Sequence, residues 1–189
     1  GDSAFYLCSS LASVTIPDGL TSIGNSAFSG CTSLTGITIP EGVTSIGDQA
    51  FSWCESLAEF KGKFASEDGR CLIIDGVLNS FAPYGLTEYS IPEGVTSIGS
   101  YAFYGCSRLA SITIPEGVTS IGWRAFYYCE SLASITIPEG VTSIGDSAFS
   151  GCESLAEFNG KFASEAGRGL IIDGVLNSFA PYGLTEYSI

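Results

Sequence analysis

The side chains that could do chemistry in this 189-residue chain recur at regular intervals. Six of the seven cysteines form one periodic set, Cys8, Cys31, Cys54, Cys106, Cys129 and Cys152. An acidic residue recurs in an equivalent position of five segments, at Asp18, Glu41, Glu93, Glu116 and Glu139. There is no histidine, which excludes Ser-His-Asp and Cys-His catalysis and the usual zinc sites.

The periodic cysteines are best explained by packing. Buried thiols behave as small apolar residues, and the repeat alone accounts for their spacing, so the spacing does not establish a disulfide framework. We therefore expect a column of buried free thiols, with disulfides between neighbouring coils as the alternative. Cys71 lies outside the column, and its counterpart in the second half of the chain is Gly169, which argues against a catalytic thiol.

The carboxylates give an equally weak case for catalysis. A divalent cation could bridge the periodic acidic residues, because hard cations favour carboxylate oxygens, but solvated turn charges explain them more simply. The adjacent pair Glu67 and Asp68 could serve as general acid and base, yet it becomes Glu165 and Ala166 in the second half. We predict no catalytic residue, no metal site and no cofactor.

Aromatic residues form the most specific candidate site. Sequence variation between the repeats concentrates at the two positions before and the two positions after an Ala-Phe pair. The candidate binding residues at these positions are Trp53, Tyr101, Tyr104, Trp123, Arg124, Tyr127 and Tyr128. Because Tyr, Trp and Arg are enriched at binding hot spots, we expect an exposed aromatic patch with an arginine beside it. The alternative is that these positions are unconstrained or that the rings only cover the edge of the coil.

A 23-residue repeat must position these residues. The segment 115–137 contains a Leu-x-x-Ile-x-Ile strand, a proline turn, a short β-branched run ended by glycine, and the Ala-Phe segment. For the Ala-Phe segment we predict one helical or 3₁₀ turn, with Ala, Phe and Cys facing inward. One unit cannot bury its own apolar face, so the copies must stack into a repeat solenoid with parallel β-ladders.

A second period of 98 residues relates the two halves of the chain. We expect about eight coils in a single solenoid domain over 1–189, with 1–98 and 99–189 as two copies of this longer unit. Because both ends interrupt a repeat, we interpret the chain as a fragment of a longer array.

Each long unit ends in an extended coil of 29 residues, at about 63–91 and 161–189, that lacks the Ala-Phe segment. There, apolar runs flank Asp75-Gly76 and Asp173-Gly174, a dipeptide that tolerates a type I′ turn. We predict a β-hairpin on the convex side of each extended coil, in place of the helical turn.

The string Ile-Pro-Glu-Gly-Val-Thr-Ser-Ile-Gly-x-x-Ala-Phe-x-x-Cys-x-x-Leu, best seen over 114–132, resembles the BspA-like leucine-rich-repeat family. The resemblance covers essentially the whole chain. It implies an extracellular or cell-surface protein with a binding role, since some members are adhesins that bind host matrix proteins or other cells. It supplies no catalytic residue, because the family motif is a packing motif.

Charge and hydropathy limit the class of partner. The chain has 7 basic and 20 acidic side chains and a net charge of −13, which makes nucleic acid a poor partner. No apolar run reaches the length of about 18 residues expected of a membrane span. We therefore predict an adhesion or binding protein that recognises a host-matrix or cell-surface protein, or a glycan. The alternative is a structural spacer or a filament formed by end-to-end self-association.

Overall fold

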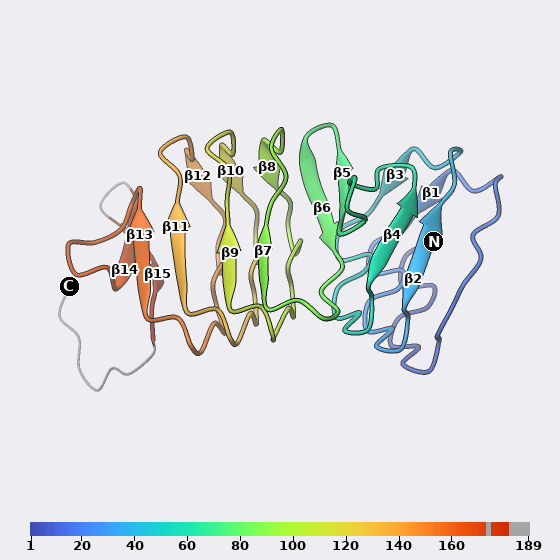
Figure 1. The fold of residues 1–189 in the computed structure, drawn as a ribbon, viewed down its shortest axis with the longest axis horizontal. Coiled ribbons are helices and arrows are strands. Elements are labelled where there is room, and N and C mark those ends of the chain that lie inside the picture. Colours follow the sequence, from blue (N-terminus) through green and yellow to red (C-terminus); the bar gives the residue numbers. More distant parts are fainter. Residues whose placement is uncertain (173–174, 182–189) are drawn as a thin grey trace.

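The computed structural model describes residues 1–172 and 175–181, and they form a β-solenoid of about six turns with parallel ladders (Figure 1). This confirms the predicted class of fold. The predicted count of about eight coils is too high. The first Leu-x-x-Val-x-Ile segment, at 11–16, forms no strand, and the last strand predicted from the repeat lies outside the described residues.

The Leu-x-x-Ile-x-Ile segments form one face of the solenoid. Its strands pair in parallel, β2 (Gly36–Ile39) with β4 (Glu59–Gly62), β7 (Glu88–Ser90) with β9 (Ser111–Thr113), and β11 (Ser134–Ile137) with β13 (Glu157–Gly160). Ile37 and Ile39 are buried while Thr38 between them is exposed, as the period of two in a strand requires.

The short Ser-Ile runs form a second face. Strand β1 (Ser22–Ile23) pairs with β3 (Ser45–Ile46). A five-stranded sheet follows, in the order β12 (Ser143–Ile144), β10 (Ser120–Ile121), β8 (Ser97–Ile98), β6 (Val77–Phe81) and β5 (Cys71–Ile74). In this sheet Ser120 is in register with both Ser97 and Ser143, so identical residues stack in columns.

The β-hairpin predicted for the first extended coil is confirmed, while its place on the convex side stays a prediction. Strands β5 and β6 pair antiparallel, and Asp75 and Gly76 have φ angles of 49° and 80°, both positive as a type I′ turn requires. Strand β6 also pairs in parallel with β8, so the hairpin continues the second face. In the second extended coil β14 (Gly169–Ile172) pairs antiparallel with β15 (Val175–Phe179), while the predicted Asp173-Gly174 turn lies outside the described residues.

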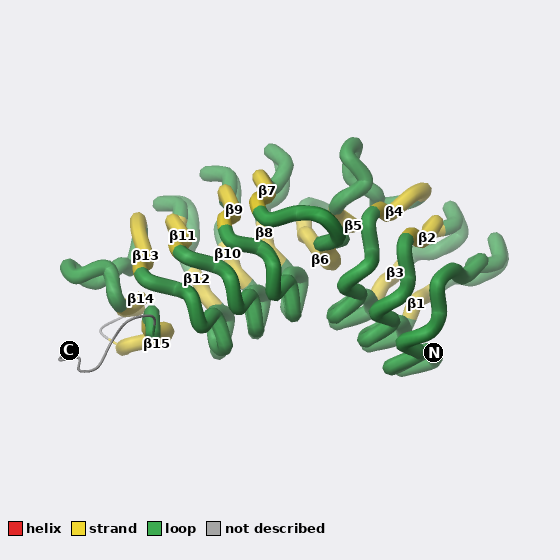
Figure 2. The backbone as a smooth tube through the Cα atoms, turned by 60° about the horizontal axis from the view of Figure 1, so that its bottom comes forward, coloured by secondary structure: helices red, strands yellow, loops and turns green. Residues whose placement is uncertain are grey.

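The Ala-Phe segments are not the predicted helical or 3₁₀ turns, and the described chain consists of strands and loops only (Figure 2). The Tyr127 and Cys129 N–H groups donate locally, to the carbonyls of Arg124 and Phe126, at 3.2 Å each. Between them, the Phe126 N–H donates to the Ala148 carbonyl of the next coil at 2.8 Å. Because alternate amides bond across coils, the consecutive i→i+3 bonds of a 3₁₀ helix cannot form.

The inward orientation of Ala, Phe and Cys in this segment is confirmed, since Ala125, Phe126 and Cys129 are fully buried. Their phenylalanine rings form two stacks, Phe5–Phe28–Phe51 and Phe103–Phe126–Phe149, with ring centroids 5.0–5.4 Å apart. Phe81 of the extended coil continues the second stack with its ring tilted by 41° against Phe103, at 4.8 Å. The core divides into two clusters of buried residues at the extended coil between these stacks.

The cysteines are free thiols, as predicted, and those of the column are buried apart from Cys8. Four thiols of the column also donate to a carbonyl of the preceding coil, as the Cys129 Sγ does to the Phe103 carbonyl at 3.2 Å. Within the described residues, no helix has the length and apolar character that a membrane crossing requires.

Candidate aromatic binding surface

The structure brings all seven predicted site residues together. Trp53 comes from the coil before the first hairpin, and the other six come from the two coils after it. The indole of Trp53 lies 5.8 Å from the ring of Tyr104 and 6.3 Å from that of Tyr128, measured between ring centroids. The remaining members are linked through ring contacts of 4.4–5.4 Å and through Arg124, and we call the seven residues the aromatic cluster.

Trp53 reaches the cluster because the extended coil lacks an Ala-Phe segment. The ladder of bonds between Ala-Phe segments runs as far as the Ser52 carbonyl, which accepts from the Gly30 N–H, and begins again at Tyr101. Trp53 crosses this interruption and lies against Gly105, where an added Cβ would overlap the indole. The absence of a side chain at Gly105 therefore makes room for the tryptophan.

The same arrangement recurs along this edge of the solenoid. Tyr128 lies against Gly151 and Leu7 against Gly30, again where a Cβ would overlap the larger side chain. Bulky residues and glycines thus alternate at one repeat position, in the order Leu7, Gly30, Trp53, Gly105, Tyr128 and Gly151. This alternation is visible in the sequence. It is the signal that would have identified Gly105 and Gly151, which contact Trp53 and Tyr128, as part of the site.

The backbone of the turn carries left-handed residues at the cluster. Trp53 and Tyr128 have φ angles of 60° and 58°, and Tyr101 and Arg124 have 60° and 52°. Such conformations cost roughly 1–3 kcal/mol for residues other than glycine. Ser147, outside the cluster, has a φ of 57°, so the strain belongs to this type of turn rather than to the cluster alone.

The cluster is only partly the exposed patch that the sequence predicts. Trp53, Trp123 and Tyr128 expose 41%, 46% and 37% of their surface. Tyr104 and Tyr127 are half-buried. Tyr101 is only 6% exposed, which corrects the prediction, because the rings of Trp123 and Tyr104 meet it edge-on at 5.0 and 5.4 Å.

Arg124 is held between two rings. Its guanidinium carbon lies 4.7 Å from the centroid of Trp123 and 4.8 Å from that of Tyr127, within the range of a cation–π interaction. Its Nε is buried and has no hydrogen-bond partner. Burial is the main cause that raises the pKa of Tyr104, and the neighbouring Tyr127 raises it further, so this phenol is neutral at physiological pH.

Two carboxylates, which sequence analysis missed, border the cluster. A surface hollow is lined by Trp53 and Tyr128, by the carboxylate residues Glu55 and Glu130, and by Gly105 and Ser107. Both glutamates are exposed and immediately follow a column cysteine. Their position two residues after the last variable position of each coil was the available signal.

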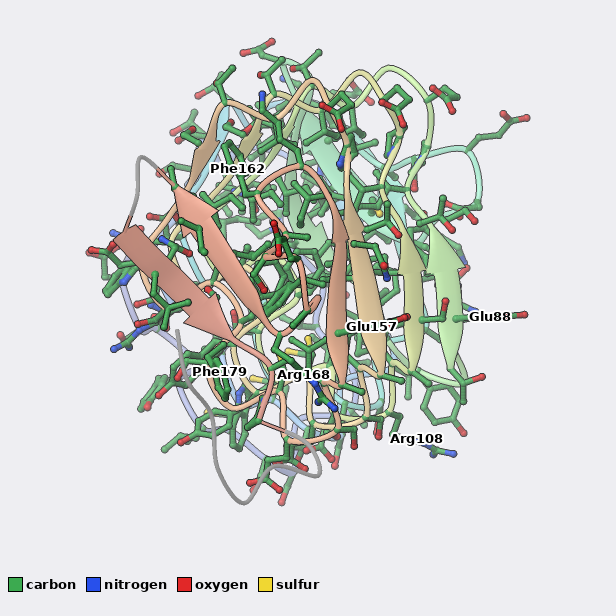
Figure 3. The ribbon with its side chains drawn as sticks, turned by 90° about the vertical axis from the view of Figure 1, so that its left-hand side faces the viewer. Glu88, Arg108, Glu157, Phe162, Arg168 and Phe179 are labelled. Atoms are coloured by element: carbon green, nitrogen blue, oxygen red, sulfur yellow. The ribbon has the colours of Figure 1, made fainter. Side chains whose placement is uncertain are left out.

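The other acidic residues offer less. In residues 1–172 and 175–181, no three or more His, Cys, Asp or Glu side chains lie where they could hold a metal ion. On the strand face, Glu88 and Glu157 project outward from β7 and β13 (Figure 3), and Lys61 pairs with Glu59 at 2.6 Å. The small hydroxyl residues between these charges provide no comparable anchor.

Comparison with known proteins agrees with this architecture. The family described as BspA type leucine rich repeat region matches six times, over residues 1–65 and 78–165. A search of curated proteins gave no match.

Comparison with solved structures also finds leucine-rich-repeat proteins. A leucine rich cell surface protein from Faecalibacterium prausnitzii is 31% identical over 82% of this chain and 55% of its own, with a TM-score of 0.57. A leucine-rich repeat protein from Eubacterium ventriosum is 30% identical over 78% of this chain and 41% of its own, with a TM-score of 0.67.

The pneumococcal vaccine antigen PcpA shares the fold, at 24% identity over 90% of this chain and 50% of its own and a TM-score of 0.63. The chain thus spans about half the length of the proteins it resembles. The six family matches cover most of the stacked coils described above, and the chain therefore belongs to the BspA-type leucine-rich repeat family.

Proposed function

We propose that this chain is a binding module of an extracellular or cell-surface protein and that it recognises a macromolecule, most simply a protein of a host matrix or a neighbouring cell, through the aromatic cluster. The observation that carries the proposal is the joining of seven Trp, Tyr and Arg side chains from three coils into one cluster with three large exposed rings. Residues of these types dominate binding energy at protein interfaces. No catalytic role is proposed.

The internal repeat supports a role other than folding. The first copy of the long unit has Ser3, Asn25, Ser26, Ser29 and Gly30 where the second has Tyr101, Trp123, Arg124, Tyr127 and Tyr128. The first copy nevertheless builds the same ladders and a buried core. The coil therefore does not need these aromatic residues in order to stack.

The surface location rests on the relatives. The protein from Faecalibacterium prausnitzii is described as a cell surface protein, and this chain is 31% identical to it over 82% of its length. A protein at the cell surface would be accessible to partners outside the cell.

The test is a comparison of binding by the chain and by a triple variant, Trp53→Gly, Trp123→Asn and Tyr128→Gly. Each new residue already stands at the same repeat position of another coil, as Gly30, Asn25 and Gly151 do, so the fold should tolerate it. A matched control, Tyr6→Ser with Leu7→Ser, removes exposed apolar side chains from the first coil.

Both variants and the parent would be assayed on immobilised matrix proteins, glycans and whole cells, with thermal stability measured alongside. We expect the parent and the control to bind a member of the panel and the triple variant to lose at least tenfold in affinity. Absence of binding by the parent would overturn the proposal and favour a structural spacer. Equal binding by all three proteins would remove the aromatic cluster as the site.

A further inference from the structure

We propose that the hollow between Trp53 and Tyr128 receives a basic side chain, arginine in preference to lysine, from a protein partner. The inference deepens the proposed function by naming the chemistry that this part of the aromatic cluster recognises. It is drawn from the shape of the hollow, its charge, and a guanidinium that the cluster already holds.

The hollow has aromatic walls and acidic edges. The rings of Trp53 and Tyr128 meet at 79° with their centroids 6.3 Å apart, and Gly105 and Ser107 complete the lining. Glu55 comes from the coil of Trp53, and Glu130 comes from the coil of Tyr128. An entering side chain would therefore meet ring surfaces and, at the same time, a carboxylate from each of two coils.

Arg124 shows how the cluster accommodates a guanidinium. It packs against one tryptophan and one tyrosine, Trp123 and Tyr127, at 4.7 and 4.8 Å from the ring centroids. The hollow presents the same pair of ring types, and both of its rings are more than one-third exposed. A planar guanidinium stacks on such rings and also binds a carboxylate through two N–H groups, which a lysine ammonium cannot do.

The charges of the hollow favour a cation. Among the described residues neither Glu55 nor Glu130 forms an ion pair, and both are exposed. The chain as a whole carries a net charge of −13, so an acidic partner would be repelled and a basic one attracted.

The hollow is assembled from departures from the repeat. Trp53 corresponds to Gly151 in the second copy, and Tyr128 and Glu130 correspond to Gly30 and Thr32 in the first. Both walls and one carboxylate are therefore absent at the equivalent repeat positions. Trp53 and Glu55 lie before the extended coil, and Tyr128 and Glu130 lie after it. Within the part of the chain that the structure describes, these residues come together at one site only.

Tryptophan fluorescence can test the inference directly. Trp53 and Trp123 are the two tryptophans of the chain, so a Trp123→Asn protein reports on Trp53 alone. The probes would be the blocked peptide Gly-Gly-Arg-Gly-Gly and the same peptide with citrulline, a neutral analogue, in place of arginine. We expect a saturable change in Trp53 emission with the arginine peptide and at least tenfold weaker binding of the citrulline peptide.

Charge variants locate the effect. In the same protein, Glu55→Gln with Glu130→Gln should weaken binding of the arginine peptide at least fivefold. The matched pair Glu93→Gln with Glu116→Gln removes as much charge from another edge and should change affinity less than twofold. Equal losses in the two pairs would mean a long-range effect of net charge and would overturn the inference. So would equal binding of both peptides, or a response to a neutral disaccharide but not to arginine.

The outcome is separable from that of the proposed function. If the Glu55→Gln and Glu130→Gln variant keeps full binding to a panel partner that the aromatic triple variant loses, the proposed function holds and this inference fails. If the arginine peptide binds but no member of the panel does, the inference holds and the proposed function fails.

Discussion

The indole of Trp53 lies against Gly105, so a residue of the coil before the first hairpin is in contact with a residue of the coil after it. The extended coil between them supplies no Ala-Phe segment, and the core divides into two clusters there. Trp53 therefore covers the place where the repeat is interrupted. The same interruption allows aromatic residues from both sides to meet.

This contact predicts a large cost for a methyl group at Gly105. Gly105→Ala should destabilise the chain by about 1–2 kcal/mol through its left-handed backbone, and by roughly 1–3 kcal/mol more because Trp53 must move. Gly85→Ala is the control, since Gly85 has the same φ within a degree, 77° against 76°, and open space around it. Urea unfolding of both variants measures the difference, and equal losses of stability would mean that Trp53 does not rest on Gly105.

The phenylalanine stack predicts a gradient of stability along the column. Phe126 is fully buried between Phe103 and Phe149, whose rings lie 5.0 and 5.4 Å away, so Phe126→Ala should cost about 3–5 kcal/mol. Phe5 is 39% exposed and stacks on Phe28 alone, so Phe5→Ala should cost roughly 1–2 kcal/mol. Denaturant unfolding would show this ranking, and similar losses at both positions would contradict the stacked column.

Sequence reasoning succeeded where a residue's role is decided by its own repeat. Ile37 and Ile39 face inward because strands alternate, and Asp75-Gly76 forms its turn because both residues tolerate positive φ. It failed where the neighbouring coil decides. The Phe126 N–H bonds to Ala148 and thereby excludes a 3₁₀ helix, and Trp123 buries Tyr101. Neither contact has a counterpart within one repeat.

The candidate site shows the same division. The types and positions of its seven aromatic and basic residues were predictable, because they vary within an otherwise constant repeat. Trp53 joins the other six only by crossing the extended coil, and no local pattern encodes that geometry. Glu55 and Glu130 were missed because an exposed glutamate is ordinarily a solvated charge, and the hollow that they line becomes visible only in the structure.

Burial of the thiol column predicts selective reactivity. Cys8 is exposed, whereas the six other cysteines are buried. A thiol reagent such as dithionitrobenzoate should therefore modify one cysteine per chain rapidly in the native state and all seven in denaturant. The Cys8→Ser variant should show almost no fast phase. Rapid modification of several thiols in the native protein would contradict the buried column.

The thiols also predict a loss of stability at alkaline pH. Burial, aided by the neighbouring Cys31, raises the pKa of Cys54 to about 12, and burial likewise raises that of Cys71 to about 12. Since an unfolded thiol titrates near 8.5, the stabilisation is complete below that pH and is lost as the pH rises towards the folded value. Each thiol should contribute a decline of about 1.4 kcal/mol per pH unit in this window. Unfolding of Cys54→Ala at several pH values between 8 and 11 should give a shallower decline than the parent.

A hydrogen-bond network at the first hairpin predicts that folding stability falls as the pH is lowered into the acid range. The Tyr89 hydroxyl donates to Asp68 Oδ2 at 3.0 Å and lies 3.3 Å from Cys71 Sγ, while the Ser66 hydroxyl and the Arg70 N–H donate to Asp68 Oδ1. Partial burial alone would raise the pKa of Asp68, but these donors together hold it below its usual range. The resulting stabilisation is therefore present above about pH 4 and is lost as the pH falls through the folded pKa.

Tyr89→Phe removes one donor to this carboxylate and leaves the ring in place. At pH 7 the variant should be less stable than the parent by about 1–2 kcal/mol, and the difference should shrink below pH 4, where Asp68 becomes protonated. Asp68→Ala, which copies Ala166 of the second unit, should make stability less dependent on pH between 5 and 3. Urea unfolding across this range measures both effects. A Tyr89→Phe deficit that stays constant from pH 7 to pH 3 would show that the hydroxyl stabilises the hairpin through Cys71 rather than through the charged form of Asp68.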